Sequence, residues 1–370
     1  MSLSLSQQQI EAFRLERAYL TGSDATPITI ASKLAGIQAQ VFSAAKLSLG
    51  LRSNSTSREI EKLFLRPNGI VKTWAMRGTL YALSANDLSL FCSAIGYDAI
   101  ERYIKHWKRY YNIKETDSER LIEAIGDSLS LEPKTRKEIS LEVSSSLGEW
   151  GKPLIESGWG GAVKCHCELG NAVFSEIKGT ETSFVLKEKY VKRWKQYSHK
   201  DAFDEILRRY LAAYGPSNMT DFGYWIGKQM PVVREVWSRV LPEMTEIEYG
   251  TRKGYILKKD IRAIRNAEPA KDTIRLLPLF DVYLLAHRKK EHLVNNAHYK
   301  KIYRNAGWIS QTILFNGKAI GVWELQEKKK ILHIRIKAFE RLTNEQKSLF
   351  ETEKTRLENY LEQRAWLHFR

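Results

Sequence analysis

The feature that most constrains the fold is an order of elements that occurs three times: helix-forming segments are followed by two short strands joined by a turn. In the first round, Ser6 and Gln9 have capping-box spacing ahead of apolar residues at helical intervals. Further helices are expected at residues 29–36, from Val41 onward, and at residues 58–65. Strands are expected at residues 70–74 and 78–83, on either side of Arg77.

The second and third rounds repeat this order. The second predicts helices at residues 118–131, 134–147 and 161–170, then a hairpin of residues 172–177 and 183–187. The third predicts helices at residues 200–214, 220–227 and 232–239, then a hairpin of residues 243–249 and 254–257. Helices followed by a β-hairpin are typical of a winged helix, a helix-turn-helix with a wing.

The C-terminal part of the chain changes to strands, at residues 274–279, 308–315, 318–325 and 331–339. Asn316-Gly317 is a strong hairpin signal, and a helix is expected from Thr343 to about residue 363. The sequence therefore predicts an α+β fold of three tandem winged-helix modules followed by a small C-terminal β-barrel with a closing helix. The expected divisions are residues 1–85, 118–197 and 198–270 for the winged helices, 86–117 for a helical linker, and 271–370 for the barrel-like domain.

The charge of the chain points to a polyanionic partner. Its 370 residues hold 59 Lys and Arg against 43 Asp and Glu, a formal net charge of +16, together with 10 Trp, 17 Tyr and 13 Phe. This combination favours nucleic acid. No apolar run is long enough to cross a bilayer and no leader opens the chain, so no membrane partner is expected. Three cysteines suit a reducing cytosol, and a cytoplasmic location is expected.

Few residues are arranged for metal or cofactor chemistry. Cys165-His166-Cys167 places three ligand types side by side, but neighbours at i and i+2 of a helix face different directions and no second pair completes a tetrahedral set. Gly-rich phosphate loops of the common spacings and a Gly-x-Ser-x-Gly elbow are missing from the sequence. We therefore expect no metal and no cofactor.

Two basic clusters are candidates for DNA contact. Lys105, Lys108 and Arg109 stand among aromatic residues, and His287-Arg288-Lys289-Lys290 is followed by Lys300, Lys301 and Arg304. Each run taken alone is equally consistent with a solvated charged face. Three wing-bearing modules on a strongly basic chain favour the neutralisation of phosphates.

Gly36-Ile37-Gln38-Ala39-Gln40 falls at the turn between the second and third helices. On a helix, Gln38 and Gln40 would point about 200° apart, whereas in an extended stretch residues two apart project to the same side. Both amides can then reach one point. By residue chemistry alone, two glutamines near a helix start more often cap the helix or face water.

Several ordered motifs together make a family recognisable. They are Gly36 to Gln40, Trp74-Ala75-Met76-Arg77-Gly78-Thr79-Leu80-Tyr81, Tyr210-Leu211-Ala212-Ala213-Tyr214-Gly215-Pro216, Asp221-Phe222, residues 276–285, and Gly307-Trp308 to Trp323. With these motifs the chain resembles the AlkZ/YcaQ family of winged-helix DNA glycosylases over nearly its whole length. The resemblance implies a basic DNA cradle and hydrolysis of the N-glycosidic bond of cationic alkylated purines, such as N7-alkylguanine and N3-alkyladenine. In some members it extends to bulky adducts or interstrand crosslinks.

The resemblance also implies roles for particular residues. Gln38 and Gln40 match the family's Gln-x-Gln catalytic signature, with Ala39 between them. Arg77, His287, Arg288 and Lys289 are expected to contact DNA. Asp281 is a candidate second carboxylate, and its alternative is a helix cap or a structural ion pair. The expected protein is a monofunctional, nucleoid-associated monomer that acts on double-stranded DNA containing alkylated bases, without an obligatory protein partner.

Two other functions use the same surface. One is a DNA-binding protein without catalysis, such as a transcription factor or a damage sensor. The other is an RNA-binding or structural protein. The paired glutamines favour the enzyme over the non-catalytic DNA-binding protein, because a regulator has no need of them.

Overall fold

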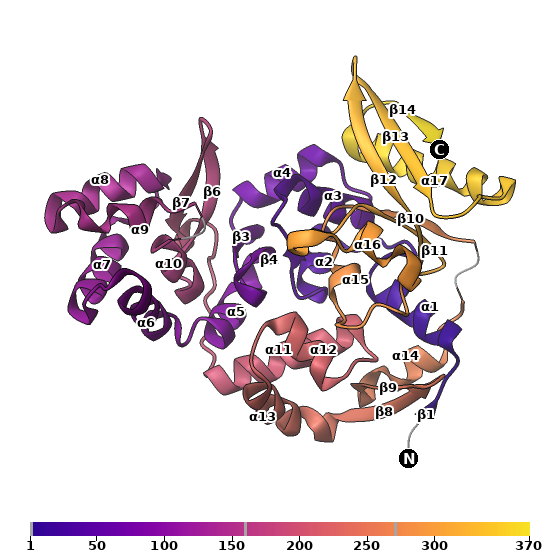
Figure 1. Ribbon diagram of the computed structural model, residues 1–370, viewed down its shortest axis with the longest axis horizontal. Helices are drawn as coiled ribbons and strands as arrows, with labels where there is room; N and C mark the ends of the chain where they lie inside the picture. Colours follow the sequence, from indigo (N-terminus) through magenta and orange to yellow (C-terminus); the bar gives the residue numbers. More distant parts are fainter. Residues whose placement is uncertain (1–2, 159–160, 270–271) are drawn as a thin grey trace. The chain divides into compact units, whose positions relative to one another are not determined.

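The computed structural model describes residues 3–158, 161–269 and 272–370, which form a mixed α+β fold. The chain divides into two compact units (Figure 1). The first unit joins Met1–Lys62 to Leu207–Arg370, and the second is Leu63–Ile206. The boundaries between the units fall within two helices. The chain passes from the first unit to the second within α4 (Ser57–Leu65) and returns at Leu207 within α11 (His199–Tyr214), the first helix of the third round.

The N-terminal helices of the first unit begin where the caps predict. The Ser6 hydroxyl accepts from the Gln9 amide and the Gln9 side chain accepts in return from Ser6, so α1 (Gln7–Arg17) starts with a complete capping box. Helix α2 (Pro27–Lys33) follows Thr26, whose hydroxyl caps the Thr29 amide. The short strand β2 (Ile37–Gln38) separates α2 from α3 (Phe42–Ser53).

The third round of the sequence pattern also lies in the first unit. Its helices are α11, α12 (Met219–Ile226) and α13 (Met230–Val240), and its hairpin is β8 (Met244–Tyr249) with β9 (Arg252–Leu257). Strand β1 (Leu3–Ser4) adds to β8 in parallel, and α14 (Ile261–Arg265) packs against α1. The helices and hairpin predicted for this round are confirmed.

The C-terminal strands form one five-stranded sheet in the order β10-β11-β12-β13-β14. The predicted turn at Asn316-Gly317 is confirmed, with both residues at positive φ and Phe315 paired to Lys318. The strands are β10 (Ile274–Leu277), β11 (Thr312–Phe315), β12 (Lys318–Lys328), β13 (Ile331–Ala338) and β14 (Ala365–Phe369).

The predicted C-terminal barrel is wrong in its closure, because the described strands form an open sheet. Closure would require β10 to pair with β14, and these two strands are instead the edges. The chain leaves β13, runs through α17 (Asn344–Leu361) and returns to pair β14 in parallel with β13, and α17 packs against β10 and β14. Helix α17 thus occupies the place where closure would bring the edges together. The connection from β10 to β11 holds the short helices α15 (Val282–Leu285) and α16 (Tyr299–Ile302).

The second unit holds the first hairpin and the second round. Strands β3 (Ile70–Trp74) and β4 (Leu80–Ser84) pair in antiparallel register, and the segment predicted to be a helical linker forms α5 (Leu88–Ile95) and α6 (Ala99–Tyr111). The second round comprises α7 (Glu115–Ser128), β5 (Lys134–Thr135), α8 (Arg136–Leu147), α9 (Lys152–Glu156), α10 (Val163–Leu169), β6 (Ala172–Lys178) and β7 (Glu181–Leu186). The rings of Trp74, Phe174 and Phe184 pack together at its core.

None of the helices in the described part of the chain combines the length and the apolar character that a bilayer crossing requires.

Candidate functional site

The Gln-x-Gln segment lies outside the helices that flank it. Gly36, at φ +96°, turns the chain out of α2, and Ile37–Gln38 is extended as β2 before α3 begins at Phe42. The prediction that this motif falls between two helices is confirmed. The Gln38 side chain is buried, Ala39 is fully buried and Gln40 is exposed.

The Gln38 side chain holds an unsatisfied acceptor. Its Oε1 is buried and has no hydrogen-bond partner among the residues that the structure describes. A buried polar atom left unpaired costs on the order of 1–3 kcal/mol, so such atoms are uncommon and often belong to functional sites. The acceptor capacity of this oxygen is therefore unused within the described part of the chain, although the atom itself is buried.

The segment is anchored from α11. Tyr214 ends this helix, and its hydroxyl donates to the Leu34 carbonyl at 2.7 Å, at the C-terminal end of α2. The Tyr214 carbonyl in turn accepts from His287 Nε2 at 2.9 Å. The Gly36 amide donates to the Ala31 carbonyl at 2.8 Å, which closes the turn. Sequence reasoning missed this chain of bonds, because Tyr214 and Leu34 are far apart in sequence.

Asp281 is fully engaged in contacts within the protein. Its carboxylate accepts from both terminal nitrogens of Arg52, at 2.7 and 2.8 Å, and both side chains are almost fully buried. It also accepts from the Ser48 hydroxyl at 3.1 Å and from the Tyr283 amide at 3.0 Å, where it caps α15. This geometry fits the alternative of a cap and structural ion pair, because the four contacts occupy both carboxylate oxygens.

His287 does not reach the surface, which contradicts the expectation that it contacts DNA. The residue is 5% exposed, and burial together with the neighbouring Arg14 holds its pKa well below the usual value. The ring stays neutral and donates to Tyr214, so it belongs to the anchor of the Gln-x-Gln segment. Arg288 and Lys289, the next two residues, are exposed as a phosphate contact requires.

The other predicted DNA contacts lie in the second unit. Arg77 sits at φ +58° in the tight turn between β3 and β4 and is half-buried. Lys105, Lys108 and Arg109 are exposed on α6. The Lys105 ammonium pairs with Glu101, one turn away, and the Arg109 guanidinium lies 5.2 Å from the Tyr110 ring centre.

Cys165, His166 and Cys167 are core residues of α10. All three are buried, and His166 Nε2 donates to the Ile122 carbonyl at 2.8 Å. Burial raises the pKa of Cys165 to about 12, so its thiol is held in the protonated form that binds metals poorly. Within the described ranges, no group of three or more His, Cys, Asp or Glu side chains is placed to hold a metal ion.

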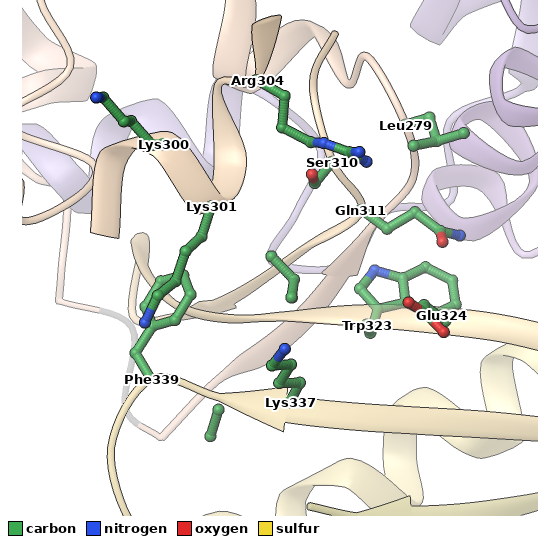
Figure 2. Close-up of a pocket in the computed structure, with 12 residues that line it drawn as sticks. Leu279, Lys300, Lys301, Arg304, Ser310, Gln311, Trp323, Glu324, Lys337 and Phe339 are labelled. Carbon is green, nitrogen blue, oxygen red and sulfur yellow. The ribbon is translucent and has the colours of Figure 1, made fainter. Parts of the chain in front are cut away.

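A basic cleft lies beside α16 in the first unit (Figure 2). Its volume is about 400 Å³, and its charged lining comes from Lys300, Lys301, Arg304, Glu324 and Lys337. The sequence drew attention to the first three residues as a basic run. Lys337 was missed because it joins them only through the pairing of β13 with β12.

Comparison with known proteins identifies the family. The sequence profile of the AlkZ-like DNA glycosylases matches residues 31–360, which include the Gln-x-Gln segment and the C-terminal strands as far as β13. The chain belongs to this family. It is therefore an enzyme, a DNA glycosylase, and its substrate is DNA.

Two comparisons with one Streptomyces species support the same family. The chain is 27% identical over 339 residues to the interstrand DNA cross-link repair glycosylase of Streptomyces sahachiroi, a match that covers 89% of this chain and 91% of the relative. The structure of the Streptomyces sahachiroi DNA glycosylase AlkZ superposes with a TM-score of 0.85 at 26% identity and covers 100% of both chains. The fold of this glycosylase is thus the AlkZ fold throughout.

Proposed function

We propose that this glycosylase repairs DNA by hydrolysing the N-glycosidic bond of purines alkylated at N7 or N3, with Gln38 and Gln40 as its catalytic residues. The observation that carries the proposal is the buried, unpartnered Oε1 of Gln38 on an extended, anchored segment. Gln40 stands two residues beyond Gln38, just past the end of β2, and the proposal assigns both amides to one sugar.

Two neutral amides are sufficient for this reaction because the substrate supplies its own activation. A purine alkylated at N7 or N3 is already cationic. When the C1′–N9 bond breaks, the electron pair moves onto the base and neutralises it, so no general acid is needed. The remaining positive charge develops on the sugar. An amide oxygen fixed beside C1′ stabilises that charge without having to reorganise.

Water completes the reaction at C1′. One amide oxygen accepts a hydrogen bond from the water and orients it, the water oxygen bonds to C1′, and the released proton passes to solvent. Glutamine cannot hold that proton at neutral pH, so this mechanism serves only leaving groups that depart without protonation. Unmodified purines are expected to be poor substrates for this reason. The motif also lacks a lysine nucleophile, which favours a monofunctional enzyme that leaves an abasic site.

The Streptomyces relative supports a wider substrate range. It is named an interstrand DNA cross-link repair glycosylase, and the match runs through 89% of this chain. We extend to this glycosylase the ability to remove bulky N7 adducts and to release one arm of an interstrand crosslink. Such a crosslink carries the same cationic purine as a simple N7-alkylguanine, so the chemistry at C1′ is unchanged.

The DNA-binding surface is proposed to consist of three winged-helix modules that act in one monomer. Each round of helices and hairpin described above has the order of elements of such a module. Arg288 and Lys289 in the first unit, and Arg77, Lys105, Lys108 and Arg109 in the second, are the proposed contacts to phosphates of double-stranded DNA. Exposure supports this role for all of them except Arg77, which is half-buried in its turn. Lys105 would have to leave its ion pair with Glu101 to contact a phosphate.

The test is single-turnover cleavage of a duplex that carries one N7-methylguanine, with abasic sites revealed by alkali. Gln38→Ala and Gln40→Ala should each lower the rate constant by roughly 100- to 1,000-fold, as the loss of one preorganised transition-state contact does. Gln229→Ala is the matched control, because Gln229 is exposed and its side chain makes no capping bond to α13.

Affinity for the duplex separates catalysis from binding. Both catalytic variants should bind the lesion duplex within about threefold of the unchanged enzyme, since a transition-state contact adds little in the ground state. A loss of affinity as large as the loss of rate would remove the catalytic assignment.

A further inference from the structure

The basic cleft has a surface that the cleavage chemistry does not use. Lys300 and Lys301 come from α16, Arg304 follows that helix, and Lys337 comes from β13. Figure 2 shows Arg304 extending toward Gln311 and Lys337 rising from the strand on the opposite side. A neighbouring open hollow of about 670 Å³ shares Lys300 and Arg304 and continues to Trp308. The two hollows together make one basic surface along the loop that follows α16.

Three of the four cations on this surface have no ion pair within the part of the chain that the structure describes. Across the described ranges, Lys300, Arg304 and Lys337 form no ion pair with a carboxylate. The Lys301 ammonium lies 3.2 Å from Nδ1 of His298 and 5.1 Å from the Phe339 ring centre. The cleft lining therefore holds four cations against one carboxylate, that of Glu324. Gathering like charges in this way raises the electrostatic potential, and an anionic ligand lowers it.

The two aromatic side chains that line the cleft itself, Trp323 and Phe339, are already engaged within the protein. Trp323 is 1% exposed and its indole N–H already donates to the Leu277 carbonyl at 2.8 Å. The Phe339 ring is stacked against His298, with 4.3 Å between the ring centres. Both rings thus pack within the protein, and the charged part of the lining is mostly cationic. This chemistry matches a chain of phosphodiesters rather than a base.

We propose that the basic cleft is a phosphate-binding subsite that grips the DNA backbone, separate from the Gln38–Gln40 segment where the bond is cleaved. The proposal relies on the DNA substrate of the family and not on the glutamine mechanism. The phosphate subsite and the glutamine mechanism are tested by different measurements. The cleft contributes to affinity and salt dependence, and the glutamines contribute to the rate of the bound complex.

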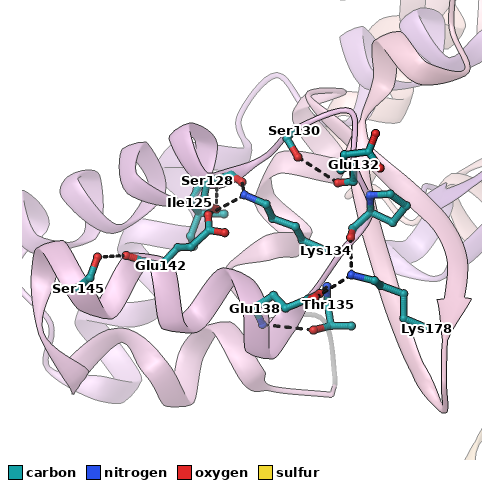
Figure 3. Close-up of polar contacts among 11 residues, drawn as sticks. Ile125, Ser128, Ser130, Glu132, Lys134, Thr135, Glu138, Glu142, Ser145 and Lys178 are labelled. Atoms are coloured by element: carbon teal, nitrogen blue, oxygen red, sulfur yellow. Dashed lines mark hydrogen bonds and ion pairs between the residues drawn. The ribbon is translucent and has the colours of Figure 1, made fainter.

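The test compares two triple variants with the same change of charge. The first is Lys300→Gln, Arg304→Gln, Lys337→Gln in the cleft. The second is Lys134→Gln, Lys137→Gln, Lys178→Gln, which removes three lysines that already pair with carboxylates. Figure 3 shows the pairs of Lys134 and Lys178. Binding of an undamaged and a lesion duplex is measured between low and moderate salt, along with the single-turnover rate constant at saturating enzyme.

Each phosphate contact adds about 0.9 to the slope of log affinity against log salt concentration. The cleft variant should lose roughly 10- to 100-fold in affinity at low salt, and its slope should fall by about 2–3. The paired-lysine variant should stay within about threefold, and neither variant should change the saturating rate constant by more than that. Equal losses in both variants, or an unchanged slope in the cleft variant, would overturn the proposal.

Two further readouts keep the result unambiguous. Arg304→Gln alone should lower the slope by about 1, which covers the case in which the triple variant folds poorly. If an acidic protein rather than DNA occupies the cleft, the DNA slope stays unchanged and the proposal fails. If Gln38→Ala cleaves normally while the cleft variant loses its salt slope, the phosphate subsite stands and the glutamine mechanism falls.

Discussion

The basic cleft and the lysine-rich side of the second unit differ in how they treat positive charge. In the second unit, Lys134 lies 2.7 Å from Glu142 and Lys178 lies 2.7 Å from Glu138 (Figure 3). The hydrogen bond from Lys178 helps to lower the pKa of Glu138 to about 2, so this carboxylate stays ionised. In the cleft, Lys300, Arg304 and Lys337 form no such pair within the described part of the chain. Both regions carry lysine and arginine side chains, but only those three of the cleft are free of a carboxylate partner among the described residues and so able to bind an external anion.

The difference shows that net charge alone does not locate a nucleic-acid surface. A formal charge of +16 is spread over 59 Lys and Arg side chains, many of which are neutralised by a carboxylate of the same chain. An exposed ion pair adds at most about 1 kcal/mol to stability, so its main effect is to mask a charge. The cations without partners are those that can release counterions when DNA binds.

A cation that is both paired and buried extends this comparison. The largest expected effect of any variant is the loss of stability when buried Arg52 loses its partner Asp281. Asp281 and Arg52 are about as buried as side chains can be and satisfy each other at two contacts. Asp281→Asn would leave a guanidinium inside the protein without its counter-charge. We expect the free energy of unfolding to fall by about 3–5 kcal/mol, measured by urea denaturation.

Asp24→Asn is the control for this change, because Asp24 is exposed and should alter stability by less than about 0.5 kcal/mol. A small effect of Asp281→Asn would show that pairing matters as little inside the protein as at its surface.

The next effect comes from buried histidines that the fold keeps neutral. Burial, Arg14 and Lys290 hold the pKa values of His287 and His292 well below the ordinary value, and the His292 ring further opposes protonation of His287. Below about pH 6.5 the unfolded chain binds protons that the folded chain does not, so stability rises with pH up to that value and is lost as pH falls. Each histidine contributes up to about 1.4 kcal/mol per pH unit.

The slope of the free energy of unfolding against pH is measured by urea denaturation at pH 7, 6 and 5. These pH values bracket the ordinary histidine pKa of about 6.5. His287→Gln should reduce the slope, since one of the two titrating groups is gone and the amide can still donate to Tyr214. His106→Gln, at an exposed position of α6, should leave it unchanged. A slope that is the same in all three proteins would contradict the neutral state of His287.

The order of elements could be predicted from the sequence because its signals are local. Strand β3 covers the residues predicted for it, and α17 begins after Thr343 because the capping box is a four-residue signal. Strand β14 was missed because its partner is β13, across the whole of α17. The open sheet was missed for the same reason, since closure depends on how the two edges are arranged.

The candidate site divides in the same way. Gln38 and Gln40 were found through a resemblance, and local chemistry alone gave no reason to prefer them to ordinary turn residues. His287 and Arg288 are adjacent in sequence, but the His287 side chain is buried and the Arg288 side chain is exposed. That difference depends on Tyr214 and Arg14, which lie in other helices. Lys337 lies at the cleft because its strand, β13, pairs with β12. Tertiary contacts decided each of these cases.

The smallest expected effect is on duplex affinity, when the lysines of the second unit lose their carboxylate partners. Glu138→Gln with Glu142→Gln would free Lys178 and Lys134 without changing a cation. Glu119→Gln with Glu123→Gln makes the same change of charge on exposed positions of α7. If pairing is what separates the two regions, the first variant should gain up to a few-fold in duplex affinity at low salt, and its salt slope should steepen by about 1–2. The second should gain less, because it only raises the general field. Equal gains would mean that total charge, and not the freedom of particular cations, determines how this glycosylase holds DNA.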